Sequence, residues 1–423
     1  DEEKLDEELR RVFDICHGCR RCFNLCDSFP KLFDLIDESD SGELDSVESA
    51  DFKPIVDACT LCDMCFLTKC PYVPPHEFNL DFPHLMLRYR AIEFKKGEIG
   101  LTTKELTKTD RNGKLLGAVS PLANWASDTS NSLTRGALEM TTKVHREAAL
   151  PKFHKNSFVS LTEKHKPDVN EDAPAFGRKA VIYATCFVNY NNPDIGNSAL
   201  SVLALNGVDT QVAYPSCCGM PQLEHGNIEE VAAAAKKVAA ELKTFIDEGR
   251  DIIALTPSCA LMLKFEWPLI VPDDADVKAL AASTYDIDEY VVDIAKKEGL
   301  TPGLKPLDGN VALHQACHSR AQNFGQKSAE MLNFIPDLSL NVIERCSGHG
   351  GSWGMMKDNF KTAIKVGKPA ARQASKASPK YVVSGCPLAG EHILQGIDFL
   401  GGSDKRPKNA NHPIEILAKA YNL

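Results

Sequence analysis

Cysteines constrain the fold of this chain more than any other residue type, because most of its fifteen cysteines fall in short, regular spacings. The first eight form two runs, Cys16-x2-Cys19-x2-Cys22-x3-Cys26 and Cys59-x2-Cys62-x2-Cys65-x4-Cys70. Three thiolates at two-residue gaps can hold three corners of one cubane iron–sulfur cluster, while the more distant fourth cysteine ligates another cluster. Zinc is the alternative metal, although its sites usually use paired Cys-x2-Cys units. The spacing therefore favours two iron–sulfur clusters.

We predict that these two [4Fe–4S] clusters exchange their fourth ligands. The two predicted ligand sets are Cys16, Cys19, Cys22 with Cys70, and Cys59, Cys62, Cys65 with Cys26. The exchange would tie the two runs together and hold the clusters close, as stepwise electron transfer requires. The segments before the runs, DEELRRVFDI and PIVDA, favour helices. Residues 1–84 are therefore expected to form a helical, ferredoxin-like domain with two clusters.

Composition narrows the class of protein further. Clustered cysteines in a chain of 423 residues favour metal ligands in a reducing cytosol over disulfides, so a cytoplasmic location is expected. The net charge of −10 argues against general nucleic-acid binding. The charge is uneven, at about −9 over residues 1–50 and about +6 over residues 85–170. Two solvated faces would explain this, and so would a basic region that meets an anionic membrane surface or an acidic partner.

The rest of the chain divides into a connector and a duplicated α/β region. Residues 85–176 contain no cysteine, and we expect a basic, partly helical connector there. Beyond them, short apolar runs alternate with helical segments, which is typical of βαβ units and a mostly parallel sheet. Cysteines 186, 217 and 259 are separated by 31 and 42 residues, and cysteines 317, 346 and 386 by 29 and 40. This agreement indicates two repeats, 177–300 and 301–423.

Each cysteine of the repeats follows a predicted strand. KAVIYAT precedes Cys186, for example, and KYVVSG precedes Cys386. Because the carboxyl ends of parallel strands meet at one edge of the sheet, each repeat is expected to gather its cysteines there. The glycine-rich stretch Gly348–Gly354 lacks the Lys-Ser/Thr of a nucleotide loop, and we expect its glycines to let the backbone approach a metal site.

These motifs carry a resemblance to known proteins. Cys186, the Cys217-Cys218-Gly219 triplet and Cys259 resemble the cysteine-rich (CCG) domain in the B subunit of heterodisulfide reductase. The whole arrangement resembles the iron–sulfur C subunit of anaerobic glycerol-3-phosphate dehydrogenase, with little contribution from residues 85–176. The resemblance implies an α+β multidomain electron-transfer subunit, which passes electrons between a flavin dehydrogenase or other redox partner and a quinone or disulfide.

The sequence departs from the five-cysteine repeat that holds a noncubane [4Fe–4S] cluster in the heterodisulfide reductase relatives. The first repeat keeps four cysteines, enough for a third iron–sulfur cluster of cubane or noncubane type: Cys186, Cys217, Cys218 and Cys259. The second repeat keeps only Cys317, Cys346 and Cys386. His318 or His349 would complete a zinc site with these three cysteines. The alternatives are an atypical cluster with one open position, a redox thiol pair, or inert cysteines.

Three functions are compatible with these features. The favoured one is an iron–sulfur electron-transfer protein that couples a flavin-type dehydrogenase to a quinone or other acceptor, with the basic connector resting peripherally on the inner face of the membrane. The alternative is a soluble reductase that acts on a disulfide, thiol or peroxide-linked substrate at the cysteine-rich domain. A structural zinc protein is the third. The sequence leaves the electron donor, the terminal acceptor and the oligomeric state open.

Overall fold

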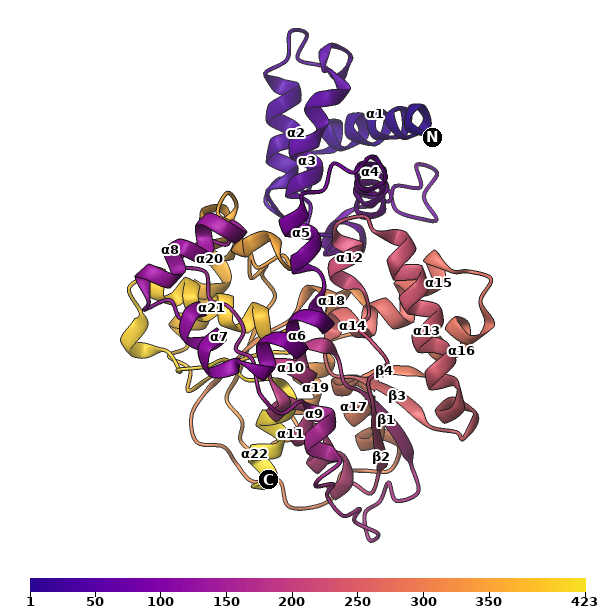
Figure 1. Cartoon of the computed structure of the whole chain (residues 1–423), viewed down its shortest axis with the longest axis vertical. Coiled ribbons are helices and arrows are strands. Elements are labelled where there is room, and N and C mark those ends of the chain that lie inside the picture. The colour runs from indigo at the N-terminus through magenta and orange to yellow at the C-terminus, as the bar shows by residue number, and fades with distance from the viewer.

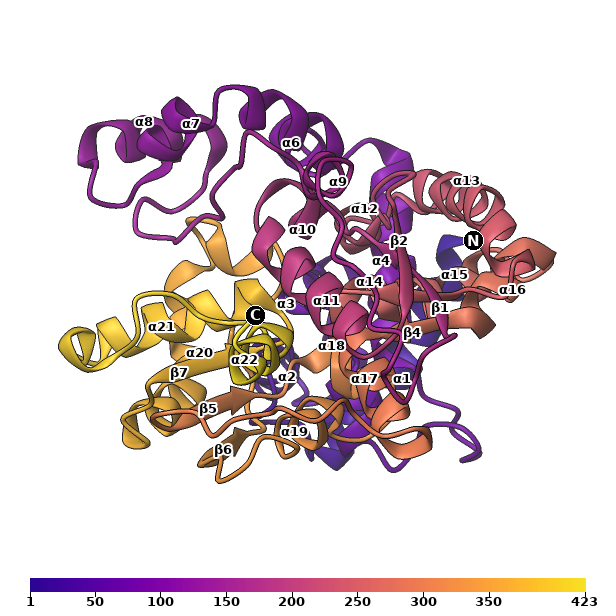
Figure 2. The ribbon, with the colours of Figure 1, turned by 90° about the horizontal axis from the view of Figure 1, so that it is seen from below.

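The computed structural model describes residues 1–423, apart from the side chain of Lys405. A group of N-terminal helices stands at one end of the molecule, and two α/β units lie beneath it (Figure 1). The helices of residues 101–142 lie along one side of the α/β units, as the turned view shows (Figure 2). Among the described residues, no helix is both long and apolar enough to cross a membrane.

The N-terminal part packs its helices around a small aromatic core. Helix α1 (Glu2–Cys19) buries Leu9, Val12 and Phe13 at helical spacing, so that one face meets the core. The ring of Phe13 lies 5.0 Å from that of Phe52, and the ring of Phe29 lies 4.7 Å from that of Phe82. The other elements are α2 (Ser28–Asp37), η1 (Leu44–Ser46), η2 (Ser49–Phe52), α3 (Lys53–Ala58), the π-helical turn η3 (Cys65–Lys69) and α4 (Phe82–Lys96). Helix α4 runs through the predicted domain boundary at residue 84.

The connector is a succession of short helices. They are α5 (Leu101–Leu106), α6 (Thr109–Ala118), α7 (Ser120–Ser127), α8 (Ser132–Thr142) and α9 (Phe158–Thr162). Buried Arg135 of α8 holds the following loop, because its guanidinium donates to the carbonyl oxygens of Arg146 at 2.8 Å and Ala148 at 2.8 Å. On the outer side of α8, Leu133 and Met140 are 83% and 86% exposed.

The first repeat is built on a four-stranded sheet of order β2-β1-β3-β4, and every neighbouring pair of strands is parallel. Its strands are β1 (Lys179–Tyr183), β2 (Asp209–Ala213), β3 (Asp251–Ala254) and β4 (Thr284–Asp286). Its helices are α10 (Cys186–Tyr190), α11 (Pro193–Leu205), α12 (Met220–Glu224), α13 (Ile228–Asp247), α14 (Pro257–Leu261), η4 (Met262–Glu266), α15 (Trp267–Ile270), α16 (Ala275–Ser283) and α17 (Ile287–Lys297). The predicted parallel α/β arrangement is confirmed.

The second repeat has the same central topology with one strand fewer. Its parallel sheet has the order β6-β5-β7, so β5, β6 and β7 correspond to β1, β2 and β3. The strands are β5 (Val311–His314), β6 (Leu340–Ile343) and β7 (Tyr381–Ser384). The helices are α18 (Cys317–Ala321), α19 (Lys327–Leu332), η5 (Trp353–Met355), α20 (Phe360–Lys376), α21 (Pro387–Phe399), η6 (Ser403–Lys405) and α22 (Pro413–Tyr421).

Continuous cores join the three parts. Side chains alternate across a strand, so β1 contributes to two cores. Val181 and Tyr183 enter the core that also contains the N-terminal helices. Ala180 and Ile182 enter a second core, which includes Val311 of β5. Because the same strand serves both cores, the cysteine-bearing loops of the three parts are held in fixed relative positions.

Candidate functional site

The first predicted ligand set comes together at the end of α1. Cys16 and Cys19 lie on its last turn, and Cys70 follows η3. Burial raises the pKa of Cys16, and the neighbouring Cys22, Cys70 and Cys19 raise it further. Burial, Cys70 and Cys19 likewise raise the pKa of Cys22 to about 11. The four thiols are therefore neighbours, although they come from both cysteine runs.

The second predicted set gathers in the same way. Burial raises the pKa of Cys26, and Cys62 and Cys59 are the nearest thiols that add to the effect. Cys65 is fully buried beside Cys62, Cys59 and Cys26, which together raise its pKa. Cys26 of the first run thus lies with three cysteines of the second run. The structure brings together both sets that the ligand exchange requires.

The loop between Cys59 and Cys65 is bent tightly. Leu61 and Asp63, on either side of Cys62, have left-handed backbones with φ of 48° and 58°. Buried Arg90 of α4 holds this loop, because its guanidinium donates to the carbonyl oxygens of Val56 at 2.6 Å and of Cys59. The same guanidinium donates to the carbonyl oxygen of Glu224 in the first repeat, at 2.9 Å. Arg90 therefore links the loop to the first repeat, and no sequence motif marks it.

The four cysteines of the first repeat converge at the carboxyl edge of its sheet. Cys186 begins the helix after β1, Cys217 and Cys218 follow β2, and Cys259 lies in the helix after β3. The sulfur atoms of Cys186 and Cys217 are 3.7 Å apart, and those of Cys218 and Cys259 are 3.3 Å apart. The backbone amide of Gly219 donates to the Cys217 sulfur at 3.5 Å.

Residues of the connector complete this first-repeat site, which the sequence did not suggest. The backbone amide of Cys217 donates to the Asp110 carboxylate at 3.0 Å, and the Tyr214 hydroxyl donates to the same carboxylate. The Thr109 hydroxyl lies in the cavity beside the thiols of Cys186 and Cys217 and has no hydrogen-bond partner outside them among the described residues. A hydroxyl donor beside four thiols fits a bound group with sulfur acceptors, as an iron–sulfur cluster is. The donor set fits that cofactor.

The three cysteines of the second repeat occupy the corresponding strand ends. Burial raises the pKa of Cys317, and the neighbouring Cys62, Cys346 and Cys386 raise it further. The amide of Gly348 donates to the Cys346 sulfur at 3.3 Å. These three thiols therefore lie near one another and also near Cys62 of the N-terminal part.

Neither candidate histidine is shown to complete a zinc site with these cysteines. The imidazole Nε2 of His318 lies 3.2 Å from the carbonyl oxygen of Leu61, so His318 contacts the N-terminal loop. Burial and nearby His392 lower the pKa of His349 to about 3. Within the described part of the chain, no three His, Cys, Asp or Glu side chains are arranged to hold a single metal ion. The same holds for the other cysteine groups, so the zinc site with His318 or His349 stays a prediction.

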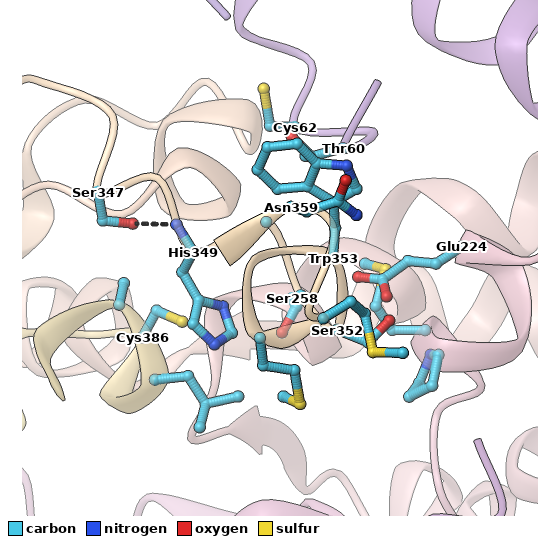
Figure 3. A pocket seen from close by; sticks show the side chains of 18 of the residues that line it. Thr60, Cys62, Glu224, Ser258, Ser347, His349, Ser352, Trp353, Asn359 and Cys386 are labelled. Atoms are coloured by element: carbon cyan, nitrogen blue, oxygen red, sulfur yellow. Dashed lines mark hydrogen bonds between the residues drawn. The ribbon is translucent and has the colours of Figure 1, made fainter. Parts of the chain in front are cut away.

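The glycine-rich stretch approaches both Cys346, whose sulfur accepts from the Gly348 amide, and the backbone of a helix. Gly348 has φ of +80°, and an added Cβ would lie 2.1 Å from the carbonyl oxygen of Ala363 in α20. Its close approach is therefore to a helix backbone. The amide of His349 donates to the Ser347 hydroxyl at 3.4 Å, so this serine, which replaces a second adjacent cysteine, hydrogen-bonds within its own loop (Figure 3).

One large cavity of about 1880 Å³ is lined by cysteines of the second predicted cubane and of both repeats, but not by those of the first ligand set. Its lining includes Cys26, Cys59, Cys62, Cys186, Cys217, Cys218, Cys259, Cys317, Cys346 and Cys386. Glu224, Ser352 and Trp353 form part of the same wall (Figure 3). Burial raises the pKa of Glu224 to about 7. Cysteines from all three parts of the chain thus face a shared space.

Comparison of the sequence with protein-family models finds one family of domain. The family model of the cysteine-rich (CCG) domain matches residues 180–264 and 311–390, one match in each repeat. The chain therefore contains a duplicated cysteine-rich domain, as predicted from its cysteine spacing.

Its relatives are iron–sulfur proteins and oxidoreductase subunits. The C subunit of the anaerobic glycerol-3-phosphate dehydrogenase of Escherichia coli K12 is 26% identical over 325 residues, which are 74% of this chain and 76% of that protein. The B subunit of the CoM/CoB fumarate reductase of Methanothermobacter marburgensis is 27% identical, over 58% of this chain and 47% of that protein. An uncharacterized iron–sulfur protein of Methanocaldococcus jannaschii is 27% identical, over 62% and 51%. The chain is homologous to these proteins, which confirms the predicted resemblance.

Proposed function

We propose that this chain is an electron-transfer subunit that carries electrons through bound iron–sulfur clusters between a dehydrogenase partner and a distant acceptor. The observation that carries the proposal is the convergence of cysteines from three separate parts of the chain on one cavity. Homology to dehydrogenase and reductase subunits supports it. A chain of clusters at short separation is the arrangement that stepwise electron transfer needs.

We assign three clusters to the thiols. The three ligand sets are Cys16, Cys19, Cys22 and Cys70 for the first cubane, Cys26, Cys59, Cys62 and Cys65 for the second, and Cys186, Cys217, Cys218 and Cys259 for a cluster in the first repeat. Each cluster supplies a centre that accepts and releases one electron. The protein sets the potential of each centre through hydrogen bonds to sulfur and through burial, and the Gly219 amide on Cys217 is one such bond.

The ligand exchange is tested by two single variants. Cys70→Ser should perturb the cluster at the end of α1, although Cys70 belongs to the second run. Cys26→Ser should perturb the other cubane. Electron paramagnetic resonance (EPR) of the dithionite-reduced, anaerobically purified chain distinguishes the two clusters. If each variant alters the cluster of its own run instead, the exchanged assignment is wrong.

The electron donor would dock where the first cluster is nearest the surface. Arg21 and Lys69 are exposed, each next in sequence to a cysteine of the first ligand set, and nearby in the sequence Phe23 is 51% exposed. Cationic side chains around an exposed ring suit a partner with an acidic, partly apolar surface. The relatives' names suggest a dehydrogenase or reductase subunit as the partner, and we propose that this donor contains flavin.

The acceptor side of the proposal is a quinone in a nearby membrane. Leu133 and Met140 project from α8 at 83% and 86% exposure, and the connector that contains them is basic overall. Apolar side chains within a basic surface suit peripheral contact with anionic lipid. We therefore propose a cytoplasmic chain that contacts the inner face of the membrane through α8.

The cavity supports one alternative function, that of a reductase. A space of about 1880 Å³ beside the first-repeat thiols can admit a small disulfide, thiol or peroxide-linked substrate. Adding such a compound to the reduced chain should then oxidise the first-repeat cluster and change its EPR signal. If a panel of these compounds leaves the signal unchanged while a quinone analogue oxidises it, the reductase function is excluded in favour of electron transfer.

A further inference from the structure

Helix α20 has a row of cationic side chains along one face. They recur at intervals of four, three, four and four residues, which places them on the same side of an α-helix over a length of about 22 Å. These residues form the basic stripe: Lys361, Lys365, Lys368, Arg372 and Lys376. All five are exposed, and within the part of the chain that the structure describes none of them pairs with a carboxylate, unlike Lys357 and Lys380 nearby.

The charge around the basic stripe has a single sign. No Asp or Glu occurs in the sequence between Asp358 and Glu391, although the whole chain has a net charge of −10. The opposite face of α20 is apolar, and it packs against α21 and the strands β5 and β6 (Figure 2). Cations without counter-charges produce a positive field at the surface, and this field attracts anionic partners. The basic stripe therefore suits a partner with an acidic surface.

An acidic protein fits the basic stripe better than a lipid surface does. A helix that binds lipid buries apolar side chains among the headgroups beside its charges. On α20 the apolar side chains are buried inside the protein instead, and among the described residues this helix exposes no large apolar side chain. The exposed apolar pair Leu133 and Met140 belongs to α8. Charges alone suit a protein interface, where complementary charges steer the two partners together and raise the association rate.

The basic stripe lies one helix thickness from the cysteine-lined cavity. Gly367 of α20 packs on the loop of the second repeat, because an added Cβ would collide with the carbonyl oxygen of Ser347. Lys365 lies about half a turn around the helix from Gly367, and it also lines the cavity. Since an α-helix with its side chains is about 10–12 Å across, a protein on the stripe would be separated from the cavity by little more than that distance.

We infer that the basic stripe docks a small acidic electron-carrier protein, which exchanges electrons with this chain at the cavity. The inference rests on the proposed function. The reduced carrier gives up one electron to an oxidised cluster beside the cavity, and no bond forms or breaks. The stripe is a protein contact on the second repeat, separate from the proposed donor site near Phe23 and from the proposed lipid contact of α8.

Binding of the full chain to a plant-type [2Fe–2S] ferredoxin, a small acidic one-electron carrier, tests this surface. Lys368→Glu/Arg372→Glu reverses two charges of the stripe and leaves Lys365 at the cavity unchanged. Lys236→Glu/Lys278→Glu is the matched control, because it changes the net charge equally at two exposed helix positions of the first repeat. Anaerobic calorimetry at low salt gives the dissociation constant. We expect it to rise at least about tenfold in the stripe variant and to stay within about twofold in the control.

Carbodiimide coupling locates the contact. The reagent joins a ferredoxin carboxylate to a lysine amine held against it, and mass spectrometry identifies that lysine. We expect coupling at Lys361, Lys365, Lys368 or Lys376, and its loss as salt screens the charges. Coupling only at Lys69 or at other lysines outside the stripe would overturn the inference. So would an absence of ferredoxin binding, an equal weakening in the control variant, or a stripe variant that loses flotation with anionic vesicles but still binds ferredoxin normally.

Reduction kinetics distinguish a failure of this docking surface from a failure of the proposed function. Reduced ferredoxin and dithionite are each mixed with the chain, and freeze-quenched EPR follows the reduction. We expect the stripe variant to be reduced more slowly than the unmodified chain by ferredoxin, but at the normal rate by dithionite. Equal rates with ferredoxin, or reduction by dithionite alone, would overturn the docked carrier and leave the proposed function standing. If neither reductant reduces any centre of the unmodified chain, the proposed function fails, and this inference fails with it.

Discussion

Thr109 shows how a single side chain outside the cysteine motifs can act on a redox centre. Its hydroxyl lies beside the thiols of Cys186 and Cys217, and the adjacent Asp110 accepts from the amide of Cys217. A hydroxyl that donates to cluster or thiolate sulfur stabilises the reduced, more negative form. If the first repeat holds the proposed cluster, Thr109 should therefore raise its reduction potential.

Replacing Thr109 tests this residue directly. Thr109→Val keeps the shape of the side chain and removes the donor, so the midpoint potential of the first-repeat cluster should fall. Thr109→Ser, which keeps the hydroxyl, is the matched control and should stay near the normal value. The measurement is a redox titration followed by EPR. Equal potentials in all three chains would show that the hydroxyl does not reach the cluster.

Gly348 is the residue on which the glycine-rich loop most depends. Its φ of +80° and its approach to Ala363 leave no room for a side chain, so Gly348→Ala should displace the loop that bears Cys346. We expect a loss of about 3 kcal/mol or more in the free energy of unfolding. Gly401→Ala is the control, because Gly401 has φ of +76° and open space around it. That variant should lose only about 1 kcal/mol. Equal losses in anaerobic unfolding measurements would contradict the packing argument.

At the scale of elements, helix α4 joins the N-terminal part to the first repeat through paired charges. The His84 imidazole contacts Asp81 at 2.7 Å and Glu266 of η4 at 3.3 Å. Burial alone would lower the pKa of His84, but the two carboxylates raise it to about 10. A pKa raised on folding gives stability that is complete below the unfolded value of about 6.5 and is lost as the pH rises through 10.

His84→Gln should therefore cost stability in a pH-dependent way. We expect the variant to be less stable by about 2 kcal/mol at pH 6, with the difference shrinking steadily toward pH 10. His165→Gln, a change at an exposed position of the connector, is the control. Chemical unfolding at several pH values provides the measurement. A difference that stays constant from pH 6 to pH 10 would mean that the charge on His84 contributes nothing.

Local features of single elements could be predicted from the sequence, whereas contacts between distant elements could not. The sequence pattern predicted the strand ends that carry Cys186 and Cys386, because the apolar run before each cysteine is a local feature. The mixed ligand sets stay a prediction. The contacts of Arg90 with Glu224 and of His318 with Leu61 join residues 134 and 257 positions apart. These contacts depend on how the N-terminal part packs against the two repeats. No local sequence pattern around either residue of a pair identifies its partner.

At the scale of the whole molecule, the proposed membrane contact is made by the exposed side of α8. We predict that the chain floats with anionic phospholipid vesicles at low salt and dissociates as salt screens the basic connector. Leu133→Glu/Met140→Glu should abolish flotation. Leu269→Glu, at a residue that is 64% exposed in the first repeat, should not. Equal flotation of all three chains would assign the membrane contact to another surface.

The N-terminal helices and both repeats share hydrophobic cores, and each of the three parts contributes cysteines to the wall of one cavity. The central claim is that these cysteines hold iron–sulfur clusters, which iron and acid-labile sulfide analysis of the anaerobically purified chain tests most directly. We predict about eight irons with matching sulfide from the first eight cysteines, and about four more from the first repeat. Fewer than four irons per chain, with zinc in their place, would contradict the account.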